Sequence, residues 1–211
     1  MSSETPDNQP TRTRLLAAVR DGGNAEAWTD FHRLYAPLIE AFLRRMGLAG
    51  ADVDDAKQEI LMIAHAALRD GTYDRSRGRF RGWLCGVARN KALEAHRNRR
   101  RPSRAQSPGG PDGVDCLSGL PDKSQEAERL IWEQEWRLAV AGEAMRQVRA
   151  TLNRKVWAAF VSYAVERRPV EEVAAELGIA TSSVYVYKQR ALQAIRRWIA
   201  EQVPEREAEP I

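Results

Sequence analysis

The sequence predicts an all-α protein composed of two small helical domains joined by a flexible linker. Apolar side chains recur at steps of three and four residues in every strongly patterned stretch, and no alternating run indicates a β-strand. Proline lacks the amide donor that a helix interior needs, and it is absent between Pro37 and Pro102 and between Pro121 and Pro169. Long helices are therefore expected in both of these stretches.

A segment rich in proline and glycine divides the chain. Residues 102–125 contain four prolines, four glycines and four serines, a composition that cannot bury enough apolar surface to offset the cost of ordering. We predict a flexible linker at residues 102–125, an N-terminal domain at residues 1–101 and a C-terminal domain at residues 126–211.

Three long helices are expected in the N-terminal domain. The first has an apolar stripe along residues 28–43 and contains Pro37, which can bend it. In the second, Asp52 is expected to cap the N-terminus, and Gly71 marks the exit. The third follows a loop and covers residues 80–101, with apolar residues on one face and basic residues on the other.

The C-terminal domain is expected to contain four helices. Two occupy residues 126–148 and 155–165, and the third begins after Pro169, because proline is favoured in the first turn of a helix. Gly178 ends this third helix, and a threonine or serine at residues 181–182 is expected to cap the fourth. A helix, a glycine turn and a second helix form the pattern of a helix-turn-helix.

A helix-turn-helix reads DNA because its second helix fits the major groove. We expect Val184 and Tyr187 to pack inward, and an ordinary helical hairpin with a polar outer face is the alternative interpretation. The side chains expected to contact DNA are Ser182, Ser183, Tyr185, Lys188, Gln189 and Arg190.

Positive charge is concentrated in one segment of the chain. Residues 75–104 carry ten arginines and one lysine against a single acid, Glu94, although the whole chain has a net charge of only +4. Dense positive charge beside aromatic side chains is typical of a surface that contacts phosphates. A solvated basic face is the alternative.

Several classes of protein are disfavoured by composition. Two cysteines cannot form a disulfide framework, and three widely spaced histidines offer no cluster of metal ligands. No apolar run approaches the roughly 20 residues of a membrane helix, and residues 1–10 contain no apolar stretch of a signal peptide. We therefore expect a cytoplasmic protein that binds no membrane and no metal.

An enzymatic role is also disfavoured. Four acids, Asp52, Asp54, Asp55 and Glu59, suggest the ligands of a metal-dependent nuclease, but their spacing does not match a calcium-binding loop. No phosphate-binding or nucleophile motif occurs. We expect no cofactor and no catalytic residue, and these acids are interpreted as an acidic helix surface.

Specific strings in both domains resemble a known family. FHRLYAPLIEAFLRRMGL, DVDDAKQEILMIAHAAL and RGRFRGWLCGVARNKALEAHRNRRR resemble region 2 of the sigma-70 family, specifically of its extracytoplasmic-function (ECF) sigma factors. VWAAFVSYAVERRPVEEVAAELGIATSSVYVYKQRALQAIRRW resembles region 4 of the same factors. The opening string TRTRLLAAVRDGGNAEAWTDFHRLYAP resembles the N-termini of ECF factors from planctomycete-like bacteria.

The resemblance implies a promoter-specificity subunit of bacterial RNA polymerase that is not itself an enzyme. The N-terminal domain would bind core polymerase and would recognise and melt the minus-ten element. The C-terminal domain would recognise the minus-35 element through its helix-turn-helix. Bacterial core RNA polymerase and promoter DNA are the implied partners, and an anti-sigma protein or another regulator is a candidate further partner.

The resemblance also implies two sets of site residues in the N-terminal domain. Those matching the core-binding surface are Asp55, Gln58, Glu59 and Met62, beside Ala56 and Lys57, where the family usually has apolar residues. Those matching the minus-ten site are Tyr73, Arg75, Arg77, Arg79, Phe80, Arg81, Trp83, Asn90 and Arg97. Basic and planar groups of this kind suit an unstacked single strand, although Phe80 and Trp83 also have the spacing of core residues.

Two other functions would explain part of the sequence. A conventional repressor or activator would bind duplex DNA through the helix-turn-helix and leave the basic segment at residues 75–104 without a role. A nuclease would require metal-dependent cleavage by the isolated chain.

Overall fold

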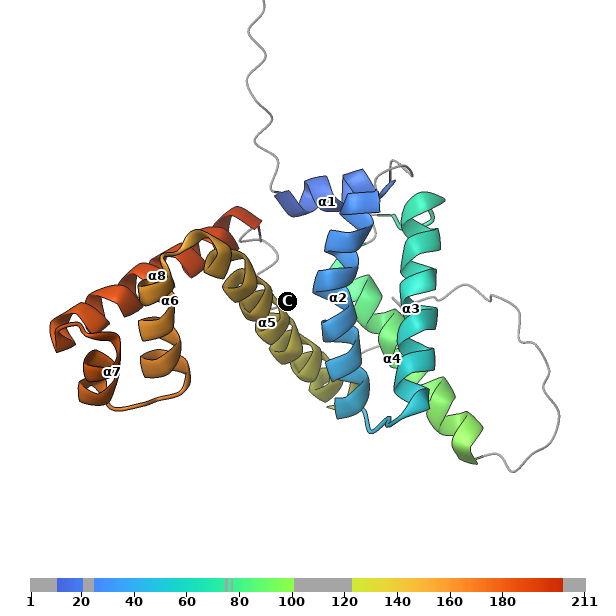
Figure 1. Ribbon diagram of the computed structural model, residues 1–211. Coiled ribbons are helices and arrows are strands. Elements are labelled where there is room, and N and C mark those ends of the chain that lie inside the picture. The colour runs from blue at the N-terminus through green and yellow to red at the C-terminus, as the bar shows by residue number, and fades with distance from the viewer. Residues whose placement is uncertain (1–10, 21–24, 75, 77, 101–122, 203–211) are drawn as a thin grey trace, which may run out of the picture. The chain divides into compact units, whose positions relative to one another are not determined.

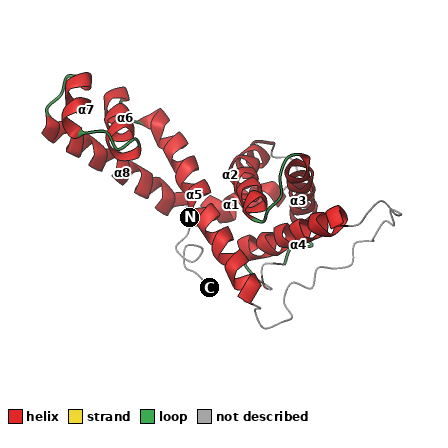
Figure 2. Ribbon diagram, turned by 90° about the horizontal axis from the view of Figure 1, so that it is seen from below, coloured by secondary structure: helices red, strands yellow, loops and turns green. Residues whose placement is uncertain are grey.

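A computed structural model describes residues 11–20, 25–74, 76, 78–100 and 123–202. Every regular element within these ranges is helical, as Figures 1 and 2 show, so the predicted all-α fold class is confirmed. The predicted linker lies outside the described residues except for its last three positions, which begin a helix. None of the helices in these ranges is both long and apolar enough to cross a membrane.

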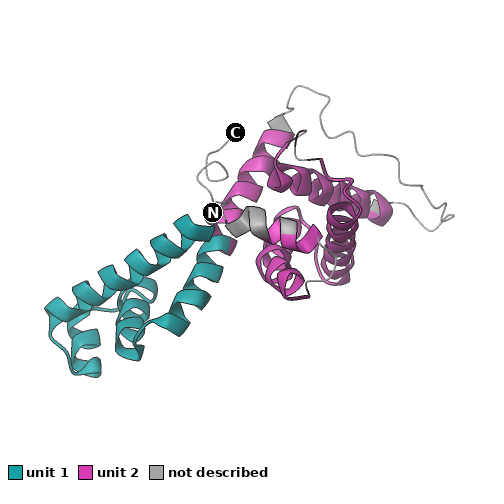
Figure 3. Ribbon diagram, turned by 90° about the horizontal axis from the view of Figure 1, so that it is seen from above, with its two compact units in different colours: residues 1–12, 140–209, 211 teal, residues 13–139, 210 magenta. Residues whose placement is uncertain are grey.

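The described residues form two compact units, coloured separately in Figure 3. The N-terminal unit spans Thr13–Ala139, and the C-terminal unit contains the described residues from Val140 onward. The boundary falls inside helix α5 (Lys123–Thr151). Residues 123–139 therefore pack with the N-terminal unit, although nearly all of them belong to the C-terminal domain predicted from the sequence pattern. The functional limits of the domains stay a prediction.

The N-terminal unit contains α1 (Thr11–Arg20) from Thr13 onward, α2 (Ala25–Arg45), α3 (Ala51–Arg69) and α4 (Phe80–Arg100). Helices α2, α3 and α4 pack against one another in all three pairings. Their core is apolar and largely aromatic at its α2 side. It includes Phe31, Tyr35, Leu38, Ile39, Phe42, Val53, Ile60, Ala64, Phe80, Leu84 and Ala88.

The first part of α5 completes this core. Trp132 is only 1% exposed, and its ring packs edge-on against Phe42 with 5.1 Å between centroids. Trp136 lies 6.0 Å from the ring of Tyr35. Two large indoles buried in this way make α5 a structural part of the N-terminal unit, because each removes a large apolar area from water.

The start of α3 differs from the expectation. The helix begins at Ala51, and the cap position is held by Gly50 at φ 57°, with no side chain capping the helix. Asp52 therefore lies inside the first turn, where its carboxylate pairs with Arg99 at 3.2 Å. The predicted Asp52 cap is wrong, since a cap residue must precede the first turn. An acid within the first turn still stabilises the helix, because its negative charge lies near the positive end of the helix dipole.

The C-terminal unit contains the rest of α5, α6 (Arg154–Phe160), the π-helical turn η2 (Val161–Val165), α7 (Val170–Leu177) and α8 (Thr181–Gln202). Gly178 ends α7 in the left-handed conformation at φ 62°, as predicted. Helix α8 begins at Thr181 itself, so the predicted cap at residues 181–182 is wrong by one or two positions. The unit's buried residues include Ala144, Val148, Ala159, Phe160, Val173, Ala174, Val184, Ala191 and Ile195.

Substituting Trp132 tests whether α5 belongs to the N-terminal core. We expect Trp132→Ala to lower the free energy of unfolding by about 3 to 5 kcal/mol, because a fully buried aromatic side chain is removed and a cavity is left. Leu130, two residues earlier on the same helix and 59% exposed, provides the control. Leu130→Ala should change stability by less than about 0.5 kcal/mol in the same urea titration, and equal losses for both variants would contradict the packing.

Candidate nucleic-acid interface

Helix α8 carries the predicted DNA-contacting residues, and their exposure varies along the helix. Val184 is buried, and Tyr187 is half-buried and packed against the apolar cluster that contains Val184, so both side chains pack inward as predicted. Of the six predicted DNA-contacting side chains, four are exposed and two, Ser183 and Lys188, are half-buried. The exposed four are Ser182, Tyr185, Gln189 and Arg190.

Two of these side chains, Tyr185 and Lys188, contact Tyr163, which is not among the predicted site residues. The Tyr163 ring on η2 meets the Tyr185 ring edge-on, with 5.4 Å between centroids. Their hydroxyl groups share a hydrogen bond, which raises the pKa of Tyr185 above its ordinary value. The Lys188 ammonium lies 5.4 Å from the centre of the Tyr163 ring. The sequence did not predict this role for Tyr163, because Tyr163 lies in an apolar stretch whose spacing is typical of core residues.

The N-terminal unit brings three predicted aromatic residues together. The rings of Tyr73, Phe80 and Trp83 lie within 5.2 to 5.7 Å of one another. The Tyr73 hydroxyl donates a hydrogen bond to the carbonyl of Gly78 at 2.9 Å. This bond joins two positions of the segment between α3 and α4. Phe80 is buried in the core, whereas Tyr73 and Trp83 keep part of their surface exposed.

The predicted basic residues have different environments. Arg81 is only 4% exposed: its guanidinium pairs with Glu133 at 3.0 Å and lies 5.4 Å from the Trp136 ring centre. In this structure neither Phe80 nor Arg81 presents its side chain to solvent. Asn90 and Arg97 are exposed on α4, and Arg79 is half-buried. Arg75 and Arg77 lie outside the described residues.

The predicted core-binding residues share one face of α3. Asp55, Gln58, Glu59 and Met62 are three or four residues apart, and all four are exposed. Glu59 also pairs with Lys91 of α4 at 2.7 Å. This face therefore presents an exposed apolar side chain beside carboxylates and an amide, a combination suited to a protein partner.

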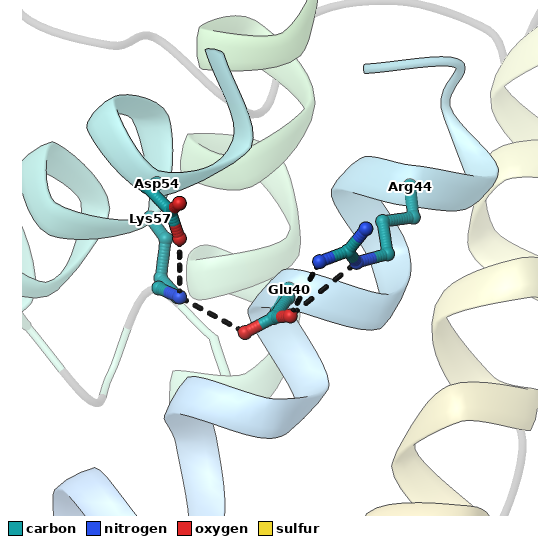
Figure 4. Close-up of polar contacts among 4 residues, drawn as sticks. All are labelled: Glu40, Arg44, Asp54 and Lys57. Carbon is teal, nitrogen blue, oxygen red and sulfur yellow. Dashed lines mark hydrogen bonds and ion pairs between the residues drawn. The ribbon is translucent and has the colours of Figure 1, made fainter. Parts of the chain in front are cut away.

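Lys57 forms a polar network between α2 and α3 (Figure 4). Its ammonium donates to Glu40 and to Asp54, each at 2.9 Å, and Arg44 donates to Glu40 at 2.8 Å. The hydrogen bonds from Lys57 and then Arg44 lower the pKa of Glu40, and those to Glu40 and Asp54 raise the pKa of Lys57. Lys57 thus ties α3 to α2 through charge, while Ala56 fills the neighbouring buried position.

Comparison with known proteins gives a consistent set of relatives. Residues 31–102 match the family model described as Sigma-70 region 2. The chain is 23% identical to the ECF RNA polymerase sigma factor RpoE of Cereibacter sphaeroides over 183 residues, covering 87% of this chain and 92% of that protein. It is 24% identical to the ECF RNA polymerase sigma factor SigE of Mycolicibacterium smegmatis, covering 92% of this chain and 70% of that protein.

A third relative matches over a shorter stretch. The ECF RNA polymerase sigma factor SigF of Caulobacter vibrioides is 36% identical over 93 residues, which are 43% of this chain and 50% of that protein. These relatives do not support the expected resemblance to factors of planctomycete-like bacteria. The matched region contains α3 and α4, which carry the predicted core-binding and minus-ten residues. Residues 31–102 therefore match region 2 of the sigma-70 family, and the chain is similar over most of its length to ECF RNA polymerase sigma factors.

Proposed function

We propose that this chain binds core RNA polymerase and directs promoter-specific transcription initiation as an ECF sigma factor. The observation that carries the proposal is the region 2 match at residues 31–102, whose α3 presents an acidic face and whose α4 is strongly basic. A repressor that binds duplex DNA alone would give this matched region no role. The proposed factor acts in the cytoplasm, needs no cofactor and performs no catalysis of its own.

The proposed minus-ten site lies on α4 and the loop before it. Exposed or partly exposed groups there provide a planar surface, an amide and positive charge, which are the groups that single-stranded DNA requires. We omit Phe80 and Arg81 from the contact set because both are buried in the N-terminal unit. The proposed contacts are Tyr73, Arg75, Arg77, Arg79, Trp83, Asn90 and Arg97.

The proposed minus-35 site lies on α8, whose exposed face would enter the major groove as the second helix of a helix-turn-helix. Ser182, Tyr185, Gln189 and Arg190 are placed to reach base edges or phosphates, with Ser183 and Lys188 beside them. An anti-sigma protein remains a candidate regulator.

Reversing the acidic charges on α3 tests polymerase binding. We expect Asp55→Lys combined with Glu59→Lys to weaken binding to core polymerase on the order of thirtyfold or more, because two interface charges become repulsive. Affinity is measured by titrating fluorescently labelled chain with core polymerase. The control, Glu26→Lys with Asp30→Lys, changes the charge equally on α2 of the same unit.

Equal affinities of the Asp55/Glu59 variant and the wild-type chain would remove the α3 face from the polymerase interface. A circular dichroism melt of each variant separates lost binding from lost folding.

The Asn90 side chain tests strand opening. We expect holoenzyme with Asn90→Ala to bind closed promoter DNA normally but to open it at least about tenfold less, because extruding a base costs a few kcal/mol that its pocket must repay. Opening is followed by permanganate reactivity of unpaired thymines. Asn98→Ala, an exposed amide on the same helix, is the matched control and should open the promoter normally.

A template with a pre-melted bubble separates the possible causes. Transcription by the Asn90→Ala holoenzyme should recover in part on the bubble, because the cost of unpairing has been removed. Equal defects on duplex and bubble templates would indicate lost folding or lost polymerase binding, and no defect on either would exclude Asn90 from the site.

A further inference from the structure

Val186 occupies the outermost position of the first two turns of α8. With about 100° between successive residues of a helix, its side chain points roughly 140° to 180° away from Val184, Ala191 and Ile195, which face the core. It is 50% exposed. Ser182 lies one turn before it and Gln189 one turn after it, so Val186 stands in the middle of the face that carries the proposed base contacts.

The fold itself gives no reason for a valine at this position. Neither apolar cluster of the described residues in the C-terminal unit includes Val186. A β-branched residue is a poorer helix former than alanine, lysine or glutamine at a solvent-facing site. Its exposed neighbour Tyr185 differs, because the ring of Tyr185 is fixed against Tyr163.

The chemistry of the major groove supplies a partner for such a side chain. Thymine alone among the four bases displays a methyl group there, and apolar side chains recognise thymine by contact with that methyl group. Polar groups one turn to either side are then placed to hydrogen-bond the flanking base edges. We propose that Val186 is a specificity-determining residue that packs against the C5-methyl of one thymine in the upstream promoter element. This inference rests on the proposed function, because it requires α8 to lie in the major groove.

Replacing thymine by uracil removes only the methyl group, and it therefore tests the contact directly. Holoenzyme containing the full chain is bound to promoter fragments in which each thymine of the upstream element is replaced in turn. At one position the wild-type protein should bind the uracil fragment about three- to tenfold more weakly, as expected for one buried methyl group. Elsewhere in the element, the substitution should have little effect.

The variant Val186→Ala completes a double-mutant cycle. It should bind the thymine promoter more weakly than wild type and should no longer distinguish thymine from uracil at the sensitive position. Val165→Ala is the matched control, because Val165 is also a 50% exposed valine of the C-terminal unit but lies outside α8. This control should keep the full discrimination of the wild-type protein.

Three distinguishable outcomes would overturn either the Val186 contact or the proposed role of the C-terminal unit. If scrambling the upstream element weakens binding but no uracil substitution does, α8 reads DNA without the Val186 contact. If Val186→Ala weakens binding to thymine and uracil fragments equally, Val186 contacts something other than the methyl group, such as the polymerase. If scrambling the upstream element has no effect, the proposed role of the C-terminal unit itself fails.

Discussion

The ion pair between Arg81 and Glu133 is the interaction on which the N-terminal unit depends. Arg81 is almost fully buried, and it has both a carboxylate at 3.0 Å and the face of Trp136 beside it. A buried charge that loses its partner costs about 3 to 5 kcal/mol, so α4 and the first part of α5 are each required by the other. Arg89 and Glu128 form a second ion pair between the same helices.

This constraint divides α4 into two faces with different roles. Arg81 and Leu84 face the core, and the docked α5 fixes that orientation. Asn90 and Arg97 then remain on the exposed surface, where a nucleic acid can reach them. Helix α3 shows a similar division, because Val53 and Ile60 are buried while Met62 and the nearby acids stay exposed. Both proposed surfaces of the unit are thus the outward faces of helices whose inward faces form one core.

Sequence periodicity was sufficient for features that local interactions determine. The all-α class, the turn at Gly178 and the buried Val184 all follow from apolar spacing and from the backbone freedom of glycine. The docking of α5 was not predictable in this way, since Arg81 and Glu133 lie on opposite sides of the predicted linker and no local pattern joins them. From the sequence alone, Arg81 on a basic helix is interpreted as a phosphate contact, because the pattern does not show that Glu133 neutralises its charge.

Sequencing the 5′ ends of transcripts made from genomic DNA by core polymerase, with and without the purified chain, shows whether the chain directs promoter-specific initiation. We expect new and discrete start sites, each preceded by two shared sequence blocks at a fixed spacing, one for each proposed DNA-binding surface. The absence of any start site beyond those of core polymerase alone would contradict the proposed function.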